Sequence, residues 1–301
     1  MTLSRRETLA GAAALVAAAT TSASTGAFAK DKIMSELPFS ATRPVSIGRV
    51  GLRAKDADAL SAYYQSVIGL QELSRDGETI TLGAGSRPLL VLESDKTLRR
   101  DDPRSTGLFH TAFLLPQRAD LGRWINHAIE KQIPIDGASD HRVSEALYLT
   151  DPEGNGIEIY ADRDPSQWVW NGSQVAMSTE RLDVEGVRGS IPAGDAGWQG
   201  FPENSVVGHV HLRVGDAPTA EAWWNGEMGF DTVSKYGADA VFLSTGGYHH
   251  HIAGNVWRSR GAGQRDVGTT GLSWVELNNK AATAASETVD PWGNAIRTVA
   301  A

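Results

Sequence analysis

The chain has 301 residues, a formal net charge of −8 and no cysteine. This length is enough for one large or two ordinary domains, each with a real hydrophobic core. The acidic balance argues against a nucleic-acid partner, which would need a basic patch, and the lack of cysteine excludes disulfides, zinc–thiolate sites and cysteine nucleophiles. A metal would therefore have to be bound by histidine, aspartate, glutamate or tyrosine.

Residues 1–29 are expected to be an export signal rather than part of the fold. Arg5 and Arg6 precede an alanine-rich apolar run, and Ala27-Phe28-Ala29 offers small residues around a cleavage site. The arginine pair resembles a twin-arginine signal, and the alternative is an ordinary secretory signal. The apolar run is too short to span a bilayer comfortably. The mature protein is thus predicted to start near Lys30, to be periplasmic or secreted, and to have no membrane partner after cleavage.

Two distant stretches of the chain repeat one another. GRVGLRAKD at 48–56 aligns with GHVHLRVGD at 208–216, and the match continues through AYY at 62–64 and AWW at 222–224. Each copy is typical of a strand, an amphipathic helix, a glycine at the helix end and further strands.

A second repeat has a different offset. TGLFH at 106–110 aligns with TGLSW at 270–274, and DPEGNGIE at 151–158 aligns with DPWGNAIR at 290–297. The earlier copy has room for a helix at 121–131 between the two motifs. The later copy is shorter, so its helix should be reduced or lost.

The repeats predict an α+β protein of four βαβββ-type modules. They lie at 45–95, 105–162, 206–256 and, in degenerate form, 268–300. A connector at 163–205, rich in Gly, Pro, Asp and Trp, is too long for a simple turn. Its tryptophans suggest that it packs on the protein surface.

The most informative motif lies at 144–160. Residues 151–156 are dense in turn formers, and the alternation that follows turns Glu158 away from the two isoleucines beside it. A carboxylate on the inner face of a strand is costly unless a cation meets it. The strand expected at 109–114 carries His110. We therefore predict that His110 and Glu158 approach each other and hold a metal.

Four strings carry a resemblance to a known family. FHTAFLLP at 109–116, SEALYLTDPEGNGIEIY at 144–160, GHVHLRV at 208–214 and GGYHHH at 246–251 together resemble the catechol 2,3-dioxygenase branch of the vicinal oxygen chelate superfamily. That superfamily includes glyoxalases, bleomycin and fosfomycin resistance proteins and extradiol dioxygenases. The similarity covers nearly all of residues 45–300. It implies modules paired into two half-open mixed β-sheet cups with helices outside, in which the first and last strands can supply metal ligands.

The resemblance implies a metal site built from His110, Glu158 and His209. The second module offers the first two residues and the third module offers His209. His211, two residues further on the same strand face, is the alternative ligand, although the superfamily register favours His209 and leaves His211 as cup lining. The matching positions of the first and fourth modules carry Arg49, Trp274 and Arg297. We therefore predict that modules two and three pair around one functional metal site. Modules one and four should pair around a second site that has lost its metal ligands.

Two imidazoles and one carboxylate leave three octahedral positions open. This arrangement suits non-haem Fe(II), which must bind a bidentate substrate and O₂ together. Mn(II) could substitute, and the ligand types also permit Zn or Ni. A lone histidine is more often a hydrogen-bonded core residue, but three ligand types at matching repeat positions favour a metal.

The resemblance also implies an acid/base histidine and a tyrosine beside the substrate. Tyr148 precedes Glu158 at the family's spacing, and His250 is the best match for the acid/base histidine within the run at 249–251. His141 is the candidate for a further histidine before the tyrosine, but its spacing departs from the family's. The alternatives are a surface metal-scavenging patch for the histidine run and a plain core tyrosine for Tyr148.

The leading hypothesis is an exported Fe(II) extradiol dioxygenase that cleaves a catechol-type aromatic diol with O₂. One alternative is a metal-dependent isomerase or lyase of the glyoxalase kind, which usually has a second carboxylate near the metal. Another is a non-catalytic small-molecule binding protein of the same superfamily, which typically lacks the metal triad. Because ring cleavage is commonly intracellular, the export signal also allows a divergent reaction at the same site. These motifs specify neither the ring substituents nor the oligomeric state.

Overall fold

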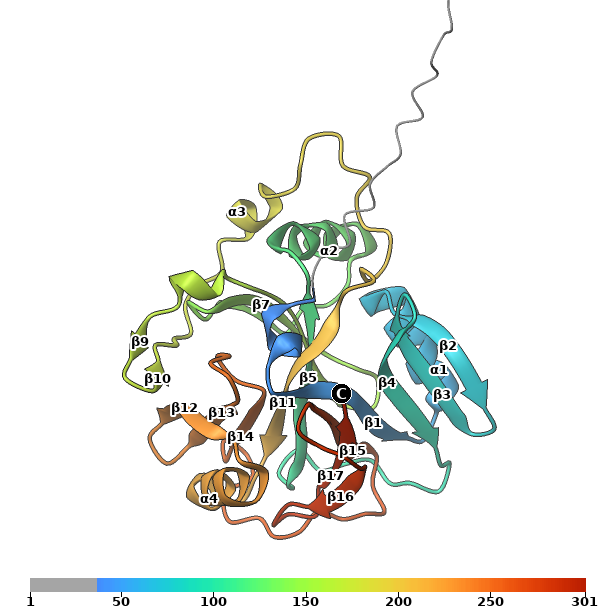
Figure 1. The fold of residues 1–301 in the computed structure, drawn as a ribbon. Coiled ribbons are helices and arrows are strands. Elements are labelled where there is room, and N and C mark those ends of the chain that lie inside the picture. The colour runs from blue at the N-terminus through green and yellow to red at the C-terminus, as the bar shows by residue number, and fades with distance from the viewer. Residues whose placement is uncertain (1–36) are drawn as a thin grey trace, which may run out of the picture. The chain divides into compact units, whose positions relative to one another are not determined.

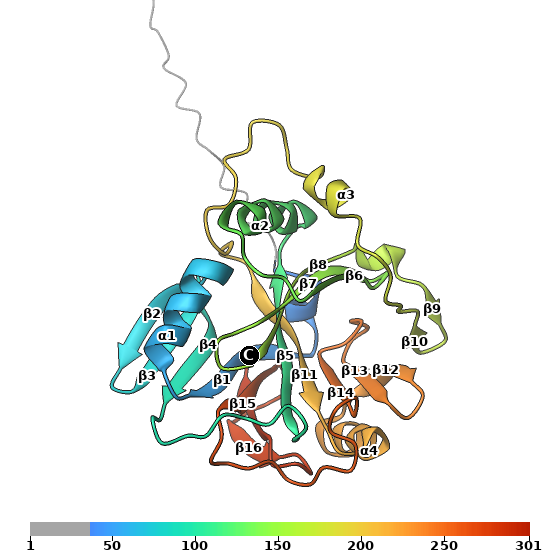
Figure 2. The same cartoon turned by 180° about the vertical axis from the view of Figure 1, so that it is seen from behind.

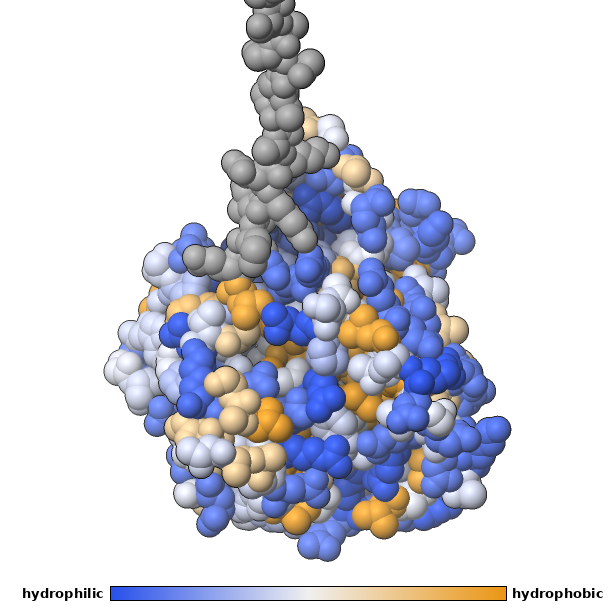
Figure 3. Space-filling model, turned by 45° about the vertical axis from the view of Figure 1, so that its right-hand side comes forward, coloured by the Kyte–Doolittle hydropathy of each residue, from blue (hydrophilic) through white to orange (hydrophobic). Residues whose placement is uncertain are grey.

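Two mixed β-sheets carry the fold, which a computed structural model describes for residues 37–301 (Figure 1). The expected export signal at 1–29 lies outside these described residues. Within them, no helix is both long and apolar enough to cross a bilayer. On the face shown in Figure 3, hydrophilic residues predominate and the hydrophobic ones form small separate groups.

The first sheet has seven strands in the order β16-β17-β15-β1-β4-β3-β2. Antiparallel pairing of β1 with β15 joins the N-terminal part of the fold to its C-terminal part. The helix α1 (Ala57–Tyr63), extended by the π-helical turn η2 (Tyr64–Ile68), lies over β2 to β4 (Figure 2). The strands are β1 (Val45–Ala54), β2 (Gln71–Asp76), β3 (Thr79–Ala84), β4 (Arg87–Ser94), β15 (Gly271–Asn279), β16 (Ser286–Val289) and β17 (Ala295–Ala300).

The second sheet has eight strands in the order β12-β13-β14-β11-β5-β8-β7-β6. Antiparallel pairing of β5 with β11 joins its two halves. The helices α2 (Arg118–Lys131) and α4 (Ala217–Met228) lie on its outside (Figure 1). The strands are β5 (Gly107–Leu115), β6 (Gly137–Asp140), β7 (Ser144–Thr150), β8 (Gly156–Asp162), β11 (Val206–Arg213), β12 (Asp231–Tyr236), β13 (Ala240–Ser244) and β14 (Ile252–Asn255).

The strand order confirms the predicted fold class and the predicted pairing of modules. Strands of the second and third repeats form one sheet, and strands of the first and last repeats form the other. No helix lies between β15 and β16 in the described chain, as the short last repeat indicated. The main hydrophobic core draws residues from both sheets, and all eight residues of β11 are buried. Strands β5 and β11 therefore form a buried base for the side chains that they carry.

The DPxGN motif forms the same turn twice. Asp151 accepts hydrogen bonds from the backbone N–H of Glu153 and from the backbone and side-chain N–H groups of Asn155, at 2.8–2.9 Å. Asp290 makes the equivalent bonds to Trp292 and Asn294. These side-chain bonds hold each turn in one conformation, so β8 starts at a defined position beside β5.

The connector packs against the rest of the fold, as its tryptophans suggested. It contains η3 (Pro165–Gln167), β9 (Trp170–Asn171), β10 (Gln174–Val175) and α3 (Val184–Arg188). Trp168 is buried, with its ring 5.7 Å from that of Phe39 in η1 (Phe39–Thr42) and 5.7 Å from that of Tyr248. The first part of the connector thus borders the cavity of the second sheet, and its later part packs on α2 and on the loop after η2.

Candidate metal centre and active site

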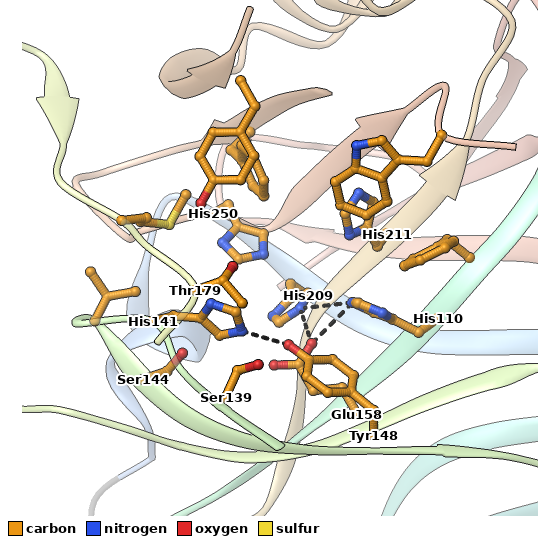
Figure 4. Close-up of a pocket in the computed structure, with 16 residues that line it drawn as sticks. His110, Ser139, His141, Ser144, Tyr148, Glu158, Thr179, His209, His211 and His250 are labelled. Atoms are coloured by element: carbon orange, nitrogen blue, oxygen red, sulfur yellow. Dashed lines mark hydrogen bonds and ion pairs between the residues drawn. The ribbon is translucent and has the colours of Figure 1, made fainter. Parts of the chain in front are cut away.

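Strand register brings the three predicted ligands together. Ala112 on β5 is the register partner both of His209 on β11 and of Glu158 on β8, so the side chains of this row share one face of the sheet. His110 lies two residues before Ala112 and therefore has the same orientation. The three side chains consequently converge over the middle of the second sheet (Figure 4).

The ligand atoms face one another at short range. The Nε2 atoms of His110 and His209 are 3.3 Å apart. Oε2 of Glu158 lies 3.0 Å from Nε2 of His110 and 3.1 Å from Nε2 of His209. Among the described histidines, aspartates and glutamates, these three form a group whose donor atoms all lie within 4.8 Å of one another.

The protonation states of this group suit a divalent cation. Burial lowers the pKa of His209 to about 4, although Glu158 opposes that shift. Burial alone would raise the pKa of the Glu158 carboxyl, but the facing imidazoles of His209 and His110 hold it well below its usual range. A neutral His209 and an ionised Glu158, both almost fully buried, are ligands that a metal ion can bind without first displacing protons.

His211 does not join the convergent group. It is the register partner of His110 across β5 and β11, and its ring lies 5.0 Å from those of His110 and Phe109 and 5.4 Å from that of Trp257, but the group of three convergent donors does not include it. Its Nε2 atom is buried and has no hydrogen-bond partner. The geometry therefore favours His209 over His211 as the third ligand and leaves His211 in the cavity wall.

Tyr148 and His141 form a hydrogen-bonded pair beside the three ligands. Tyr148 on β7 is the register partner of Glu158, and its hydroxyl lies 2.6 Å from Nε2 of His141. Nδ1 of His141 lies 2.7 Å from the carbonyl oxygen of Ser178. Because a carbonyl can only accept, Nδ1 of His141 carries a proton, and Nε2 of a neutral ring accepts from Tyr148. Burial raises the pKa of Tyr148 well above its usual value, so its hydroxyl stays protonated.

His250 lies above His209, with ring centroids 4.1 Å apart. Its Nδ1 atom is 2.8 Å from Nδ1 of His249, and Nε2 of His249 is 2.8 Å from Oδ1 of Asp162 at the end of β8. Burial lowers the pKa of His250 well below its usual value, so the ring is neutral. All three histidines at 249–251 are buried, so the alternative of a surface metal-scavenging patch is wrong.

These groups line a cavity of about 290 Å³. A β-bulge shapes its wall, because the register between β5 and β11 skips Phe109. Phe109 and His110 therefore both reach the cavity although they are neighbours on a strand. The bulge also brings the backbone oxygen of Phe109 within 2.1 Å of where a Cβ on Gly156 would stand, so β8 needs a glycine there.

Several lining residues were not identified from the sequence. Met177 and Thr179 come from the connector, which the repeats do not cover, and a strand pattern cannot reveal a bulge at Phe109. The complete lining is Phe109, His110, Ser139, His141, Val143, Ser144, Tyr148, Glu158, Met177, Thr179, His209, His211, Tyr236, Phe242, His250 and Trp257.

Comparison with known proteins agrees with this architecture. A family model described as Glyoxalase/Bleomycin resistance protein/Dioxygenase superfamily matches residues 46–159. The chain is 42% identical over 236 residues to a protein of Bacillus subtilis (strain 168) named catechol-2,3-dioxygenase, covering 77% of this chain and 81% of that protein. The chain belongs to the glyoxalase/bleomycin resistance protein/dioxygenase superfamily.

Solved structures with the superfamily fold resemble this one over most of its length. A putative dioxygenase from Bacillus subtilis subsp. subtilis str. 168 has a TM-score of 0.55 at 12% identity, covering 84% of each chain. Glyoxalase I from Zea mays has a TM-score of 0.51 at 15% identity, covering 85% of this chain and 92% of that one. At these identities the likeness concerns the fold alone.

In the cup of the first sheet, side chains occupy part of the space, and Arg49 and Glu276 border a cavity of about 340 Å³. Trp274 lies against Gly51, where a Cβ would come within 2.3 Å of the indole, and its Nε1 donates to Glu93 at 2.7 Å. Arg49 donates to Glu276 at 2.8 and 2.5 Å, and the Arg297 guanidinium lies 4.4 Å from the Trp274 ring centroid. Arg49, Trp274 and Arg297 thus stand at the positions that match the three predicted ligands of the second sheet.

Proposed function

We propose that this protein is a non-haem Fe(II) extradiol dioxygenase that opens a catechol-type ring with O₂. The observation that carries the proposal is the convergence of Nε2 of His110, Nε2 of His209 and Oε2 of Glu158 in one buried group. Two imidazoles and one carboxylate are the ligand set typical of non-haem Fe(II) oxygenases. The 42% identity to a protein named catechol-2,3-dioxygenase supports the same reaction class.

The donor set fits a divalent metal on chemical grounds. The cavity lining includes two histidine nitrogens and one carboxylate that lie together, and the cavity leaves open space beside them. Bound Fe(II) would supply positive charge that favours a deprotonated catechol, and the one-electron chemistry that O₂ requires. Mn(II) fits the same donor set.

His250 is the proposed proton acceptor. Its Nδ1 atom is engaged with His249, which leaves Nε2 as the atom that can take a proton from a catechol hydroxyl and later return it. Tyr148, fixed by His141, lies beside Glu158 and offers a hydroxyl that can orient the substrate oxygen. The ring is thereby held between His250 and Tyr148 above the ligand group.

The glyoxalase-type alternative is less well supported. Such enzymes usually use a second carboxylate near the metal. Among residues 37–301, Glu158 is the only carboxylate in the lining of this cavity. Strand β11, which pairs with β5, supplies histidines instead of a second carboxylate. Non-catalytic binding proteins of this superfamily typically lack the metal triad, so the convergence of these three side chains counts against that alternative.

Anaerobic reconstitution tests the proposed reaction. The protein is loaded with Fe(II), mixed with catechol and then exposed to air. Oxygen uptake together with a yellow ring-opened semialdehyde is the expected result. If iron is bound and a broad panel of catechols consumes no oxygen, the proposal is wrong.

Three substitutions test the ligand assignment. His110→Ala, His209→Ala and Glu158→Ala should each abolish stoichiometric Fe(II) binding, because each removes one of three donors, and metal analysis after desalting measures the loss. His127→Ala, a histidine on α2 outside both cups, is the matched control and should retain iron. Full iron occupancy in any of the three ligand variants would reject that residue as a ligand.

We also propose that residues 1–29 direct export to the periplasm or beyond. Support comes from the arginine pair, the alanine-rich run and the small residues around Ala29. N-terminal sequencing of the exported protein should find a start near Lys30. Replacing Arg5 and Arg6 together by lysine should retain the chain in the cytoplasm if the twin-arginine route is used, and continued export would indicate an ordinary secretory signal.

A further inference from the structure

Aromatic rings form one wall of the cavity. The Phe109 ring lies 5.3 Å from that of His110 and 5.3 Å from that of Trp257, and His211 packs against both Phe109 and Trp257. Trp257 is 48% exposed, so it lies at the mouth of the cavity. The wall therefore runs from a predicted metal ligand outward to solvent.

The wall continues towards His250. The Phe242 ring lies 5.8 Å from that of His211 and 5.2 Å from that of His250, and Tyr236 packs on Phe242 at 5.2 Å. A ring held between His250 and Tyr148 above the ligand group would thus have its outer edge against aromatic side chains, which line this part of the cavity (Figure 4). Such surfaces favour apolar groups.

Across residues 37–301, no lysine or arginine lines this cavity. Arg142 and Arg163, which lie near it along the chain, are already paired with Glu180 and Asp140. Arg258 follows Trp257 but is exposed and outside the lining. An anionic substituent would therefore meet aromatic surface with no cation to pair with, which disfavours its burial strongly.

The protein's overall charge acts in the same direction. With a formal net charge of −8, the molecule does not attract anions from solution. The cavity, at about 290 Å³, is slightly smaller than the range of about 300–1,000 Å³ usual for small-molecule sites. It suits one aromatic ring with a compact substituent.

We propose that the substrate is a catechol whose substituent is uncharged and apolar, and that the Phe109–Trp257–Phe242 wall selects it over carboxylated catechols. The proposal rests on the proposed function for the ring chemistry. It adds that the substituent lies against this wall, on the side of the cavity opposite Tyr148 and His141.

A matched pair of substrates tests the selectivity. 4-Methylcatechol and 3,4-dihydroxybenzoate carry a methyl group and a carboxylate at the same ring position. We expect kcat/KM for the methyl compound to exceed that for the carboxylate by about 100-fold or more, because the carboxylate would be buried unpaired. Calorimetric titration of the Fe(II)-loaded protein without oxygen should give the same order of affinities independently of turnover.

Two neighbouring substitutions locate the selectivity. Trp257→Arg places a cation at the mouth and should raise kcat/KM for the carboxylate relative to the methyl compound by about tenfold. Arg258→Gln is the matched control on the adjacent exposed residue and should leave the ratio unchanged. If Arg258→Gln selectively weakens binding of the carboxylate, Arg258 pairs with substrate anions and the inference is overturned.

The outcomes separate this inference from the proposed function. Equal cleavage and equal binding of the two substrates would reject the neutral-substrate inference while leaving the dioxygenase intact. Preferential anaerobic binding of the methyl compound without oxygen uptake from any catechol would reject the dioxygenase while retaining the selectivity of the cavity. If Trp257→Arg has the same ratio of kcat/KM values for the two substrates as the parent protein, the aromatic wall does not set the substrate preference.

Discussion

A hydrogen-bonded row of Asp162, His249 and His250 determines which nitrogen of His250 is free. The Asp162 carboxylate can only accept, so Nε2 of His249 carries the proton between them. Nδ1 of a neutral His249 must then accept from Nδ1 of His250. Nε2 of His250 is consequently unprotonated and is the atom available as a base.

Replacing His250 by phenylalanine should separate metal binding from turnover. The variant keeps a ring against His209 but has no proton acceptor, so we expect kcat to fall by about 10²–10⁴-fold. Iron content, measured after desalting, should stay at the level of the parent protein. Loss of iron in His250→Phe, or unchanged kcat, would contradict the assigned role.

Asp162→Asn should impair turnover through the tautomer of His249. An asparagine can donate to Nε2 of His249, which moves the proton to Nδ1 and makes His250 the acceptor, so Nε2 of His250 becomes protonated and unable to act as a base. We expect kcat to fall by about 10–100-fold with little change in KM or iron content.

A conservative variant distinguishes this effect from simple destabilisation. Asp162→Glu restores a carboxylate and should recover part of the activity, as judged by kcat across a pH series. If Asp162→Asn and Asp162→Glu are equally impaired, the carboxylate acts only through packing.

At the level of elements, the two DPxGN turns are structurally equivalent but lie in different cups. Burial raises the pKa of both Asp151 and Asp290, and each side chain accepts three short hydrogen bonds from its own turn. Only the turn at Asp151 leads into the strand that carries Glu158.

Alanine substitutions at the two turns should therefore differ in function but not in stability. Asp151→Ala and Asp290→Ala each leave buried N–H groups unpaired, so we expect each to lower the free energy of unfolding by about 1–3 kcal/mol in denaturant titrations. Asp151→Ala should also weaken iron binding, because the start of β8 moves, whereas Asp290→Ala should retain it. Equal loss of iron in both variants would show that the turns act through global stability.

For the whole molecule, the three predicted ligands converge in one cup, and the matching positions of the other cup carry Arg49, Trp274 and Arg297. The predicted ligands come from β5, β8 and β11, which are adjacent in one sheet. In the other sheet Arg49 pairs with Glu276 and Trp274 fills the space over Gly51. The two cups share a common core, so the second one supports the first structurally.

We expect one iron per chain, and chelation should destabilise the protein. A ligand that binds only the folded state stabilises it by about 2.7 kcal/mol when free ligand is at 100 times its Kd. Removing iron with a chelator should therefore lower Tm in calorimetry, and adding it back should restore Tm. Two irons per chain, or a Tm of the parent protein that does not respond to iron, would contradict a single site.

Much of the architecture follows from the sequence because it is written in repeated local patterns. Strand alternation, turn residues and helix ends recur with the modules, and the loss of ligand residues at Arg49, Trp274 and Arg297 together indicated which modules share a cup. The strand order confirms that pairing. The roles of His110, His209 and Glu158 as ligands remain predictions, although the fold brings the three side chains together.

The residues of the cavity wall, and the contacts of His249 and Asp162 behind His250, could be identified only from the tertiary structure. Phe109 reaches the cavity because of a register shift between two strands distant in sequence, and Met177 comes from a connector without repeat pattern. Asp162 meets His249 across two different modules. Periodic patterns indicate which face of an element is buried. Contacts such as these depend on how elements far apart in the chain are placed in the folded protein, and no local sequence pattern encodes that placement.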